Sequence, residues 1–445
     1  MPIQKIKKIT IENFKNVKYG EILFVGKDDY INVTGIYGQN GSGKTAVVDC
    51  FSILKKIFTS RTLPNSFSGM LSYENDARIT LVVDCLGERE NTYFVRLKRT
   101  QEDKIFIAEE KLTTKWHKKG AQARVLFHYH YEDEKIITTN KSKESLASLD
   151  ALKIIKDISI TQQCSFLFFD NFRKIVHEHR KFLEHYQVLE QFRLLGNNIF
   201  IYTSEYSGLI GANILAPVGM STTTSLLPFN LDYHGNFVPI DIVPIYENVI
   251  EQLNIILPEI IPGLNLEMIQ RENRVHNNEE EVRLEFIAKR DNQRFSLSYE
   301  SDGIKKIIGL VLFLVEVYNR PDAIAVIDEF DSGIFEYLLG ELLEMMQTGS
   351  KGQLIFTSHN LRILEMLPTQ CIIFSTINPS RRYIRLKGVK PSNNLRDFYL
   401  RTIQLGGQEE ELYEGKPTSR IRLAFLKAGE HRNLINQVSI SCKGK

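Results

Sequence analysis

The sequence predicts an α/β fold in which a mixed sheet is accompanied by an antiparallel β lobe and a helical insert. First, an apolar run over 29–37 leads into glycine-rich residues 38–43 and then into apolar residues at helical spacing over 45–58. Second, alternating apolar and polar runs cover about 78–140 and are separated by turn-like residues, which is typical of antiparallel hairpins. Third, apolar residues recur every three or four positions over about 170–195, which indicates one amphipathic helix.

Weaker signals complete this organisation. An almost alternating run over 5–12 predicts an opening strand, and a second helix is expected over 244–256, ending before Pro258. Strand and helix signals return from residue 282 onward. Four units are expected: an N-terminal lobe at 1–165, a mainly helical insert at 166–264, a C-terminal lobe at 265–400 that joins the first lobe in one domain, and a tail at 401–445.

The composition is that of an ordinary globular protein. The 445 residues include 56 Lys and Arg against 54 Asp and Glu, which leaves a net charge of +2, and 43% of them are hydrophobic. This length corresponds to roughly two to four domains. The charge balance argues against a disordered chain and against a strongly basic protein that coats nucleic acid. A local basic face could still bind DNA.

Cysteine usage and hydropathy bear on the compartment. The five cysteines are scattered and show no CxxC pair. No apolar run reaches the ~18–20 residues that a membrane span needs. We therefore expect a protein of the reducing cytoplasm that is neither secreted nor embedded in a membrane.

The strongest motif lies between the predicted strand and the predicted helix near the N-terminus. Residues 38–45, Gly-Gln-Asn-Gly-Ser-Gly-Lys-Thr, match the phosphate-loop pattern G-x-x-x-x-G-K-[ST]. Its glycines let successive N–H groups face phosphate, Lys44 reaches the β and γ oxygens, and Thr45 offers its hydroxyl to Mg²⁺. The predicted nucleotide-binding residues of the loop are Gly38, Asn40, Gly41, Ser42, Gly43, Lys44 and Thr45.

Two later strands end in residues that can act on a phosphate. The apolar run 321–327 ends in Asp328 and Glu329, at the carboxyl edge where α/β sheets bind ligands. Asp328 is predicted to hold Mg²⁺ through water, and Glu329 to polarise the attacking water. The short strand over 352–358 is followed by His359, whose imidazole can contact the γ-phosphate. On its own, either strand could equally be structural.

A turn ahead of an apolar helix adds a further candidate. Ser301, Asp302 and Gly303 precede the helical run that begins near Ile307. Serine is also favoured at a helix start for capping alone, so the plain interpretation is an N-cap. The position of this turn about 25 residues before the Asp-Glu strand favours a functional interpretation.

With these motifs identified, the chain resembles the ABC-type ATPases of the RecF, SMC and OLD (overcoming lysogenization defect) superfamily. The resemblance rests on the opening segment 9–16, the phosphate loop, the Ser301-x-Gly303 turn with the Asp-Glu strand, and the strand ending at His359. These motifs span residues 1 to about 360. The resemblance implies a P-loop NTPase of ABC-ATPase head type that hydrolyses ATP with Mg²⁺, and it places Lys15 near the nucleotide.

The resemblance also implies how two copies would meet. Ser301 and Gly303 would cap the γ-phosphate of a nucleotide held by the other subunit, so that two ATP molecules are enclosed in a head-to-tail homodimer. Residues 330–333 would lie near the seam. The turn reads Glu-Ser-Asp-Gly here, where transporters and SMC proteins have Leu-Ser-Gly-Gly. The family's Q-loop glutamine would be Gln162 or Gln163, unless these two form an ordinary polar pair before a strand.

Function is expected by analogy with the same family. OLD proteins carry a metal-dependent nuclease of the Toprim class that needs an Asp-x-Asp pair, and this sequence contains none. The chain is therefore expected to act as an ATP-driven switch for a separately encoded effector, such as a nuclease or toxin, in bacterial antiphage defence.

Three alternatives stay open at this point. The first is a RecF-like ATPase that binds double-stranded DNA in repair or chromosome maintenance. The second is the nucleotide-binding subunit of a membrane transporter, which the long segment between Lys44 and Asp328 disfavours. The third is an ATPase with its own RNase activity, suggested only by Arg–His spacings around His179 and His185.

Overall fold

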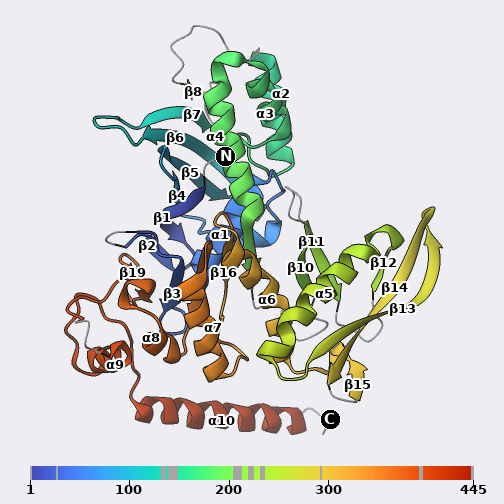
Figure 1. Cartoon of the computed structure of the whole chain (residues 1–445). Coiled ribbons are helices and arrows are strands. Elements are labelled where there is room, and N and C mark those ends of the chain that lie inside the picture. The colour runs from blue at the N-terminus through green and yellow to red at the C-terminus, as the bar shows by residue number, and fades with distance from the viewer. Residues whose placement is uncertain are drawn as a thin grey trace.

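The described residues form four sheets, and helix α1 (Lys44–Phe58) packs between the two largest of them (Figure 1). The computed structural model describes residues 3–26, 29–131, 137–138, 149–203, 213–218, 225–230, 236–290, 293–389 and 394–441. The mixed α/β architecture expected from the sequence, with a P-loop head and an antiparallel β lobe, is confirmed.

The six-stranded sheet carries the chemistry predicted from the motifs. Its strand order is β19-β18-β3-β17-β16-β9, and every neighbouring pair is parallel except β18 and β19. The strands are β3 (Val33–Tyr37), β9 (Ile199–Tyr202), β16 (Ile324–Ile327), β17 (Gln353–Ser358), β18 (Ile372–Ser375) and β19 (Tyr383–Ile384). Ala325 and Ile327 of β16 enter one hydrophobic core, and Ile324 and Val326 enter the other. Burial on both faces explains why this strand reads as a continuous apolar run.

The seven-stranded sheet forms the antiparallel lobe, in the order β2-β1-β4-β5-β6-β7-β8. The strands are β1 (Gln4–Phe14), β2 (Val17–Leu23), β4 (Ala77–Cys85), β5 (Arg89–Arg99), β6 (Ile105–Trp116), β7 (Arg124–His130) and β8 (Ile137–Thr138). The hairpins expected over about 78–140 are confirmed for the described residues. One face of this sheet shares a core with α1, through residues such as Ile9, Phe51 and Leu54.

Helices cover both faces of the six-stranded sheet. α1 lies on the face toward the antiparallel lobe, and α6 (Asp302–Asn319) and α7 (Glu336–Gly349) belong to the core on the other face. The buried α6 residues run from Lys306 to Leu314 almost without a break, because this helix is surrounded by apolar neighbours. The first turns of α6 lie beside the residues that follow β16, because Lys306 donates to the carbonyl of Glu329.

The helical region that follows the lobe differs from its prediction. In place of one amphipathic helix over about 170–195 there are α3 (Asp170–Glu178) and α4 (Leu183–Asn198). The backbone is extended at His179, with φ −96° and ψ 101°, and residues 180–182 form a 3₁₀ turn. Helix α2 (Leu149–Thr161) packs beside them in Figure 1. The prediction of a single helix was wrong because both helices bury apolar residues in the same core, so the spacing continues across the break.

The remaining described elements include a two-stranded sheet, β10-β11, and a four-stranded sheet formed by β12, β14, β13 and β15. Helix α5 (Val243–Ile260) continues through Pro258 and is therefore longer than the helix predicted over 244–256. The others are β10 (Asn213–Val218), β11 (Ser225–Asn230), β12 (Asn236–Pro239), β13 (Asn265–His276), β14 (Glu279–Arg290), β15 (Gln293–Ser296), α8 (Arg362–Met366), α9 (Leu395–Leu405) and α10 (Thr418–Ser441).

The predicted unit boundaries stay predictions. Strand β9 falls within 166–264 but belongs to the six-stranded sheet, where it pairs with β16. α9 extends from the predicted C-terminal lobe into the predicted tail. Among the described residues, none of the helices has the length and apolar character that crossing a membrane requires.

Candidate functional site

The phosphate loop links β3 to α1 at the carboxyl edge of the six-stranded sheet. Gly41 and Gly43 have φ values of 77° and 86°, in the left-handed region that glycine adopts without strain. Gly43 is the N-cap of α1 and gives the helix no side-chain cap. The first-turn N–H groups of α1, with the positive end of the helix dipole, are thus oriented for an anion. Asn40 and Gly41 lie exposed at the tip of the loop.

Four side chains that the sequence did not single out support the loop. Asn16 donates its amide to the carbonyl of Gly41, and Tyr383 donates its hydroxyl to the carbonyl of Gly43 at 2.7 Å. The Ser42 and Ser375 hydroxyl oxygens are 2.5 Å apart. The buried Arg382 donates to the carbonyl of Asn16 at 2.5 Å. Their sequence signal is weak, because β18, β19 and the turn after β1 reach the loop only through folding.

Lys44 and Thr45 occupy the positions expected of the motif. The Lys44 ammonium donates to the carbonyls of Gly38 and Gln39 at 2.8 and 3.0 Å, so it lies over the loop it follows. Burial lowers the pKa of Lys44, and the nearby Asp328 carboxylate opposes that shift. Thr45 Oγ1 lies 3.4 Å from Asp328 Oδ1, which brings the loop and the Asp-Glu strand together as predicted.

Thr357 on β17 connects the two acids. Its hydroxyl donates to Asp328 Oδ1 at 2.5 Å and accepts from the backbone N–H of Glu329 at 2.8 Å. Glu329 has a φ of 49°, which is uncommon for a residue with a side chain and stores backbone strain. Thr357 has no distinguishing signal in the sequence, since a single threonine in an apolar strand is common.

His359 follows β17 and faces a buried acid. Its Nε2 lies 3.7 Å from Asp331 Oδ2, and its side chain is 50% exposed. Asp331 is buried, and its Oδ1 has no hydrogen-bond partner among the described residues. The structure therefore places His359 beside the turn that follows the Asp-Glu strand, and its contact with a γ-phosphate stays a prediction.

The Ser301 turn lies against the loop that follows the Asp-Glu strand. Ser301 is the N-cap of α6, and its hydroxyl accepts from the N–H of Ile304 at 3.4 Å, so the plain capping interpretation holds. The backbones of Gly303 and Gly333 touch, because a Cβ on Gly303 would lie 2.1 Å from the Gly333 carbonyl oxygen. Ser301 itself is exposed. It is therefore available to a group outside this chain.

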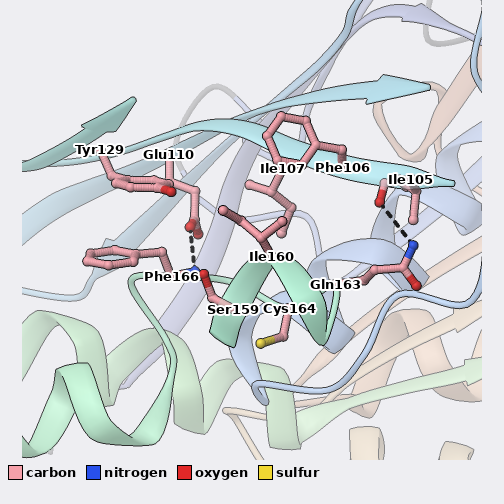
Figure 2. Close-up of a pocket in the computed structure, with 10 residues that line it drawn as sticks. All are labelled: Ile105, Phe106, Ile107, Glu110, Tyr129, Ser159, Ile160, Gln163, Cys164 and Phe166. Carbon is pink, nitrogen blue, oxygen red and sulfur yellow. Dashed lines mark hydrogen bonds between the residues drawn. The ribbon is translucent and has the colours of Figure 1, made fainter. Parts of the chain in front are cut away.

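The two weaker candidates have partners elsewhere. Lys15 is exposed and forms an ion pair with Asp49 of α1 at 2.5 Å, whereas the next residue, Asn16, contacts the phosphate loop. Gln162 is exposed. Gln163 donates its side-chain amide to the carbonyl of Ile105 on β6 (Figure 2) and to the side chain of Asn65. Their roles toward a nucleotide stay predictions.

The segment that contains Gln163 is fastened to the lobe by one buried carboxylate, which Figure 2 shows reaching toward it from β6. Glu110 is fully buried and accepts from the Ser165 and Tyr93 hydroxyls at 2.5 and 2.6 Å. It also accepts from the backbone N–H groups of Phe166 and Leu167. Burial raises the pKa of Glu110, and the bonds from Ser165 and Tyr93 oppose that rise.

The Arg–His spacings lack the geometry of a ribonuclease. His185 is buried beside Phe127 and Phe182, and burial lowers its pKa to about 4. Arg173 is paired with Asp170 and Glu190. Because His185 is buried among aromatic side chains, it is not open to a substrate, and the structure disfavours the ribonuclease alternative at this residue.

The gathered residues fit a nucleoside triphosphate with Mg²⁺. Thr45 and Asp328 would hold the ion, since a hydroxyl and a carboxylate are oxygen ligands of the kind that Mg²⁺ accepts. The N–H groups at the start of α1 and the Lys44 ammonium would hold the phosphates. When bound, the ion neutralises the charge that develops on the phosphate oxygens.

The comparison with protein families agrees with this geometry. Residues 8–204 match the family model described as an AAA domain. The chain is a P-loop ATPase. The family match and the motif geometry agree with the ATP hydrolysis that the sequence predicted.

Solved structures with a similar arrangement include SMC heads and RecF. An SMC head domain from Pyrococcus furiosus, with an extended coiled coil and bound to the C-terminal domain of ScpA, is 13% identical, with a TM-score of 0.41 over 86% of this chain and 96% of that one. The SMC head domain from Thermotoga maritima is 18% identical, with a TM-score of 0.37 over 86% and 99%. The recombination mediator RecF is 14% identical, with a TM-score of 0.33 over 81% and 93%. No curated protein matches this ATPase.

Proposed function

We propose that the ATPase is a nucleotide-driven switch in which two copies close around ATP and thereby control a separate effector. The observation that carries this proposal is the division of the site within one chain. Lys44, Thr45 and Asp328 gather at the sheet edge, whereas Ser301 points its exposed turn outward while Gly303 contacts Gly333. One copy thus offers a phosphate-binding half and an exposed capping half.

The surface beside the exposed turn is suited to being covered. Tyr299 is 72% exposed and Phe335 is 70% exposed, and they flank the contact between Gly303 and Gly333 in the sequence. Aromatic side chains of this size are enriched where protein surfaces meet. A second copy that brings its phosphate loop to Ser301 would cover them.

The chemistry follows from the positions of the side chains. Glu329 would orient and polarise the attacking water, with its backbone held by Thr357. His359, which lies beside Asp331, would contact the γ-phosphate. Ser301 and Gly303 of the second copy would stabilise the charge on the transferred phosphoryl group. Hydrolysis would therefore be slow in a single copy and faster in the closed pair.

The effector belongs to the proposal by analogy. The sequence has no Asp-x-Asp pair, so it does not supply the carboxylates of a Toprim nuclease. ATPase subunits of bacterial antiphage defence systems control separate effectors in this way, and we place the chain among them. A protein nuclease or toxin is then the partner that responds to opening or closing of the pair.

The proposal is tested with Glu329→Gln. Removing the base should lower kcat by about 10²-fold or more and trap the ATP-bound pair. We expect light scattering after size-exclusion chromatography to give twice the monomer mass with Mg²⁺ and ATP and the monomer mass without nucleotide. Adding Lys44→Ala to the same variant should abolish the change in mass.

Two results would contradict the proposal in different ways. Parental hydrolysis by Glu329→Gln would remove the assignment of the base. A monomer at saturating Mg²⁺ and ATP would remove the switch. Binding of the ATP-bound form to duplex DNA, with an affinity that falls steeply with salt, would favour the RecF-like alternative in repair or chromosome maintenance.

A further inference from the structure

We infer that Lys306 is a positioning residue for ATP hydrolysis, which holds the backbone of Glu329 in its strained conformation and ties it to the helix that begins at Ser301. This lysine belongs to none of the sequence motifs. Its position inside α6, three residues after Gly303, reads as an ordinary helix residue.

Lys306 is buried, and its ammonium bridges two backbone carbonyls, an arrangement called the clasp below. Only 5% of the residue is exposed, which is rare for lysine. Its ammonium donates to the carbonyl of Ser332 at 2.8 Å and also to the carbonyl of Glu329. Because burial penalises the charge, the pKa of Lys306 falls to about 8, with the nearby acid Asp331 opposing the shift. A cation kept at this cost needs compensating bonds, and the two carbonyls provide them.

The turn that receives these bonds begins at the expected base. Glu329 has a φ of 49°, and its carbonyl accepts from the N–H of Ser332 at 2.9 Å as well as from Lys306. Its own N–H is bonded to Thr357. Glu329 is therefore held on both sides of its strained backbone, by Thr357 through the N–H and by Lys306 through the carbonyl. Such strain persists only where the surroundings fix it.

Lys306 also joins two functional segments that are distant in sequence. It lies in the first turns of α6, the helix capped by Ser301, and Gly303 of that helix touches Gly333 of the turn. A displacement of α6 would therefore move the carbonyl of Glu329. If the proposed function is correct, capping of the second copy's nucleotide by Ser301 would act through Lys306 on hydrolysis in this copy.

The neighbouring Lys305 provides a matched control. It sits in the same helical turn, but its ammonium lies 3.9 Å from the exposed Asp302 and reaches neither carbonyl of the turn. A Lys→Met change at this position removes the same charge from the same helix. The two variants therefore differ in the clasp and not in the net charge of the chain.

The test compares Lys306→Met with Lys305→Met in the full chain. We expect Lys306→Met to keep its affinity for ATP and to lose roughly tenfold or more in kcat, because a base misplaced by about 1 Å is a poor catalyst. Lys305→Met should keep kcat within twofold of the parent. In the Glu329→Gln background, Lys306→Met should change the residual rate by less than twofold, because the group it positions is already gone.

The outcomes separate this inference from a structural role and from the proposed switch. An unchanged kcat in Lys306→Met overturns it, and so does an equal loss with and without Glu329. If Lys306→Met fails to fold, Lys306→Leu, which also removes the donor, is measured in the same two backgrounds against the same criteria, with Lys305→Leu as its control. A loss of kcat in a chain that never dimerises with ATP would keep the clasp and remove the switch.

Discussion

Thr357 is the side chain on which the two acids of the site depend. A single hydroxyl contacts both the carboxylate of Asp328 and the backbone N–H of Glu329, at 2.5 and 2.8 Å. It therefore positions Asp328, the residue expected to hold Mg²⁺, relative to Glu329, the residue expected to act as base. Side chains that orient a metal ligand commonly matter nearly as much as the ligand itself.

We expect Thr357→Val to lower kcat by about 10-fold to 100-fold and to weaken the Mg²⁺ dependence of hydrolysis. Valine preserves the volume and removes both hydrogen bonds. Steady-state hydrolysis at varied Mg²⁺ measures the effect. The control is Thr34→Val on β3, since Thr34 is also fully buried and its hydroxyl has no hydrogen-bond partner among the described residues. Equal losses in the two variants would mean that β-strand packing, and not the bridge, sets the rate.

The residues that sequence patterns identify are those with a fixed spacing. Lys44, Thr45, Asp328 and Glu329 follow a loop or a strand in a known order, and the structure places them together. Thr357, Asn16 and Lys306 act through contacts between distant segments, and each is of a residue type that is common at such positions. Nothing short of the folded arrangement distinguishes them from a strand threonine, a turn asparagine or a helix lysine.

Among the elements, the turn between α2 and α3 is held in place by a buried carboxylate. Glu110 of β6 is fully buried and receives two hydroxyl and two backbone donors from Tyr93 and from residues 165–167. As an acceptor of four bonds, it fastens a segment that has no strand pairing of its own to the antiparallel lobe. Leaving those donors unpaired would cost free energy at each of them.

Glu110→Gln should destabilise the chain by about 1–3 kcal/mol, because an amide NH₂ would face groups that also donate. The pH dependence gives a second signature. The pKa of Glu110 is raised in the folded chain, so its contribution to stability is largest below the unfolded pKa and is lost as pH rises through the folded pKa. The difference between variant and parent should therefore shrink over that range.

Thermal unfolding of both proteins at a series of pH values measures this prediction, with Glu102→Gln on the exposed loop between β5 and β6 as the control. A variant–parent difference that stays constant with pH would show that the pKa of Glu110 is the same in the folded and the unfolded chain. A difference near zero would show that the four donors find other partners.

Helix ends were the least predictable elements. The break at His179 leaves the apolar spacing intact, because Val176 of α3 and Val188 and Phe192 of α4 enter the same core. α5 continues past Pro258 although proline removes one helix hydrogen bond, because Val249, Leu253 and Leu257 of the same helix are packed in the core. Both differences arise from packing, which local sequence signals describe only in part.

Across the whole molecule, the two sheets are joined by one buried amide as well as by the shared core around α1. Gln353, at the start of β17, accepts from the N–H of Ile6 at 2.7 Å and donates to the carbonyl of the same residue at 2.9 Å. It thus satisfies both backbone groups of Ile6 on β1 from the other sheet. The nearby Lys5 donates to Asn32 at 3.2 Å and also contacts the carbonyl of Lys351.

Gln353→Leu should lower the free energy of unfolding by about 2–5 kcal/mol, because two buried backbone groups would lose their partner together. The orientation of the antiparallel lobe, which carries Asn16 toward the phosphate loop, would loosen with it, so the affinity for ATP should fall as well. Chemical denaturation and ATP titration measure the two effects, and the exposed Gln101→Leu should change unfolding by less than about 0.5 kcal/mol. Loss of stability with unchanged ATP affinity would show that the phosphate loop keeps its shape without a firm junction between the sheets. Unchanged stability would show that the shared core and the other hydrogen bonds between the sheets, such as those of Lys5, hold the lobe to the head without Gln353.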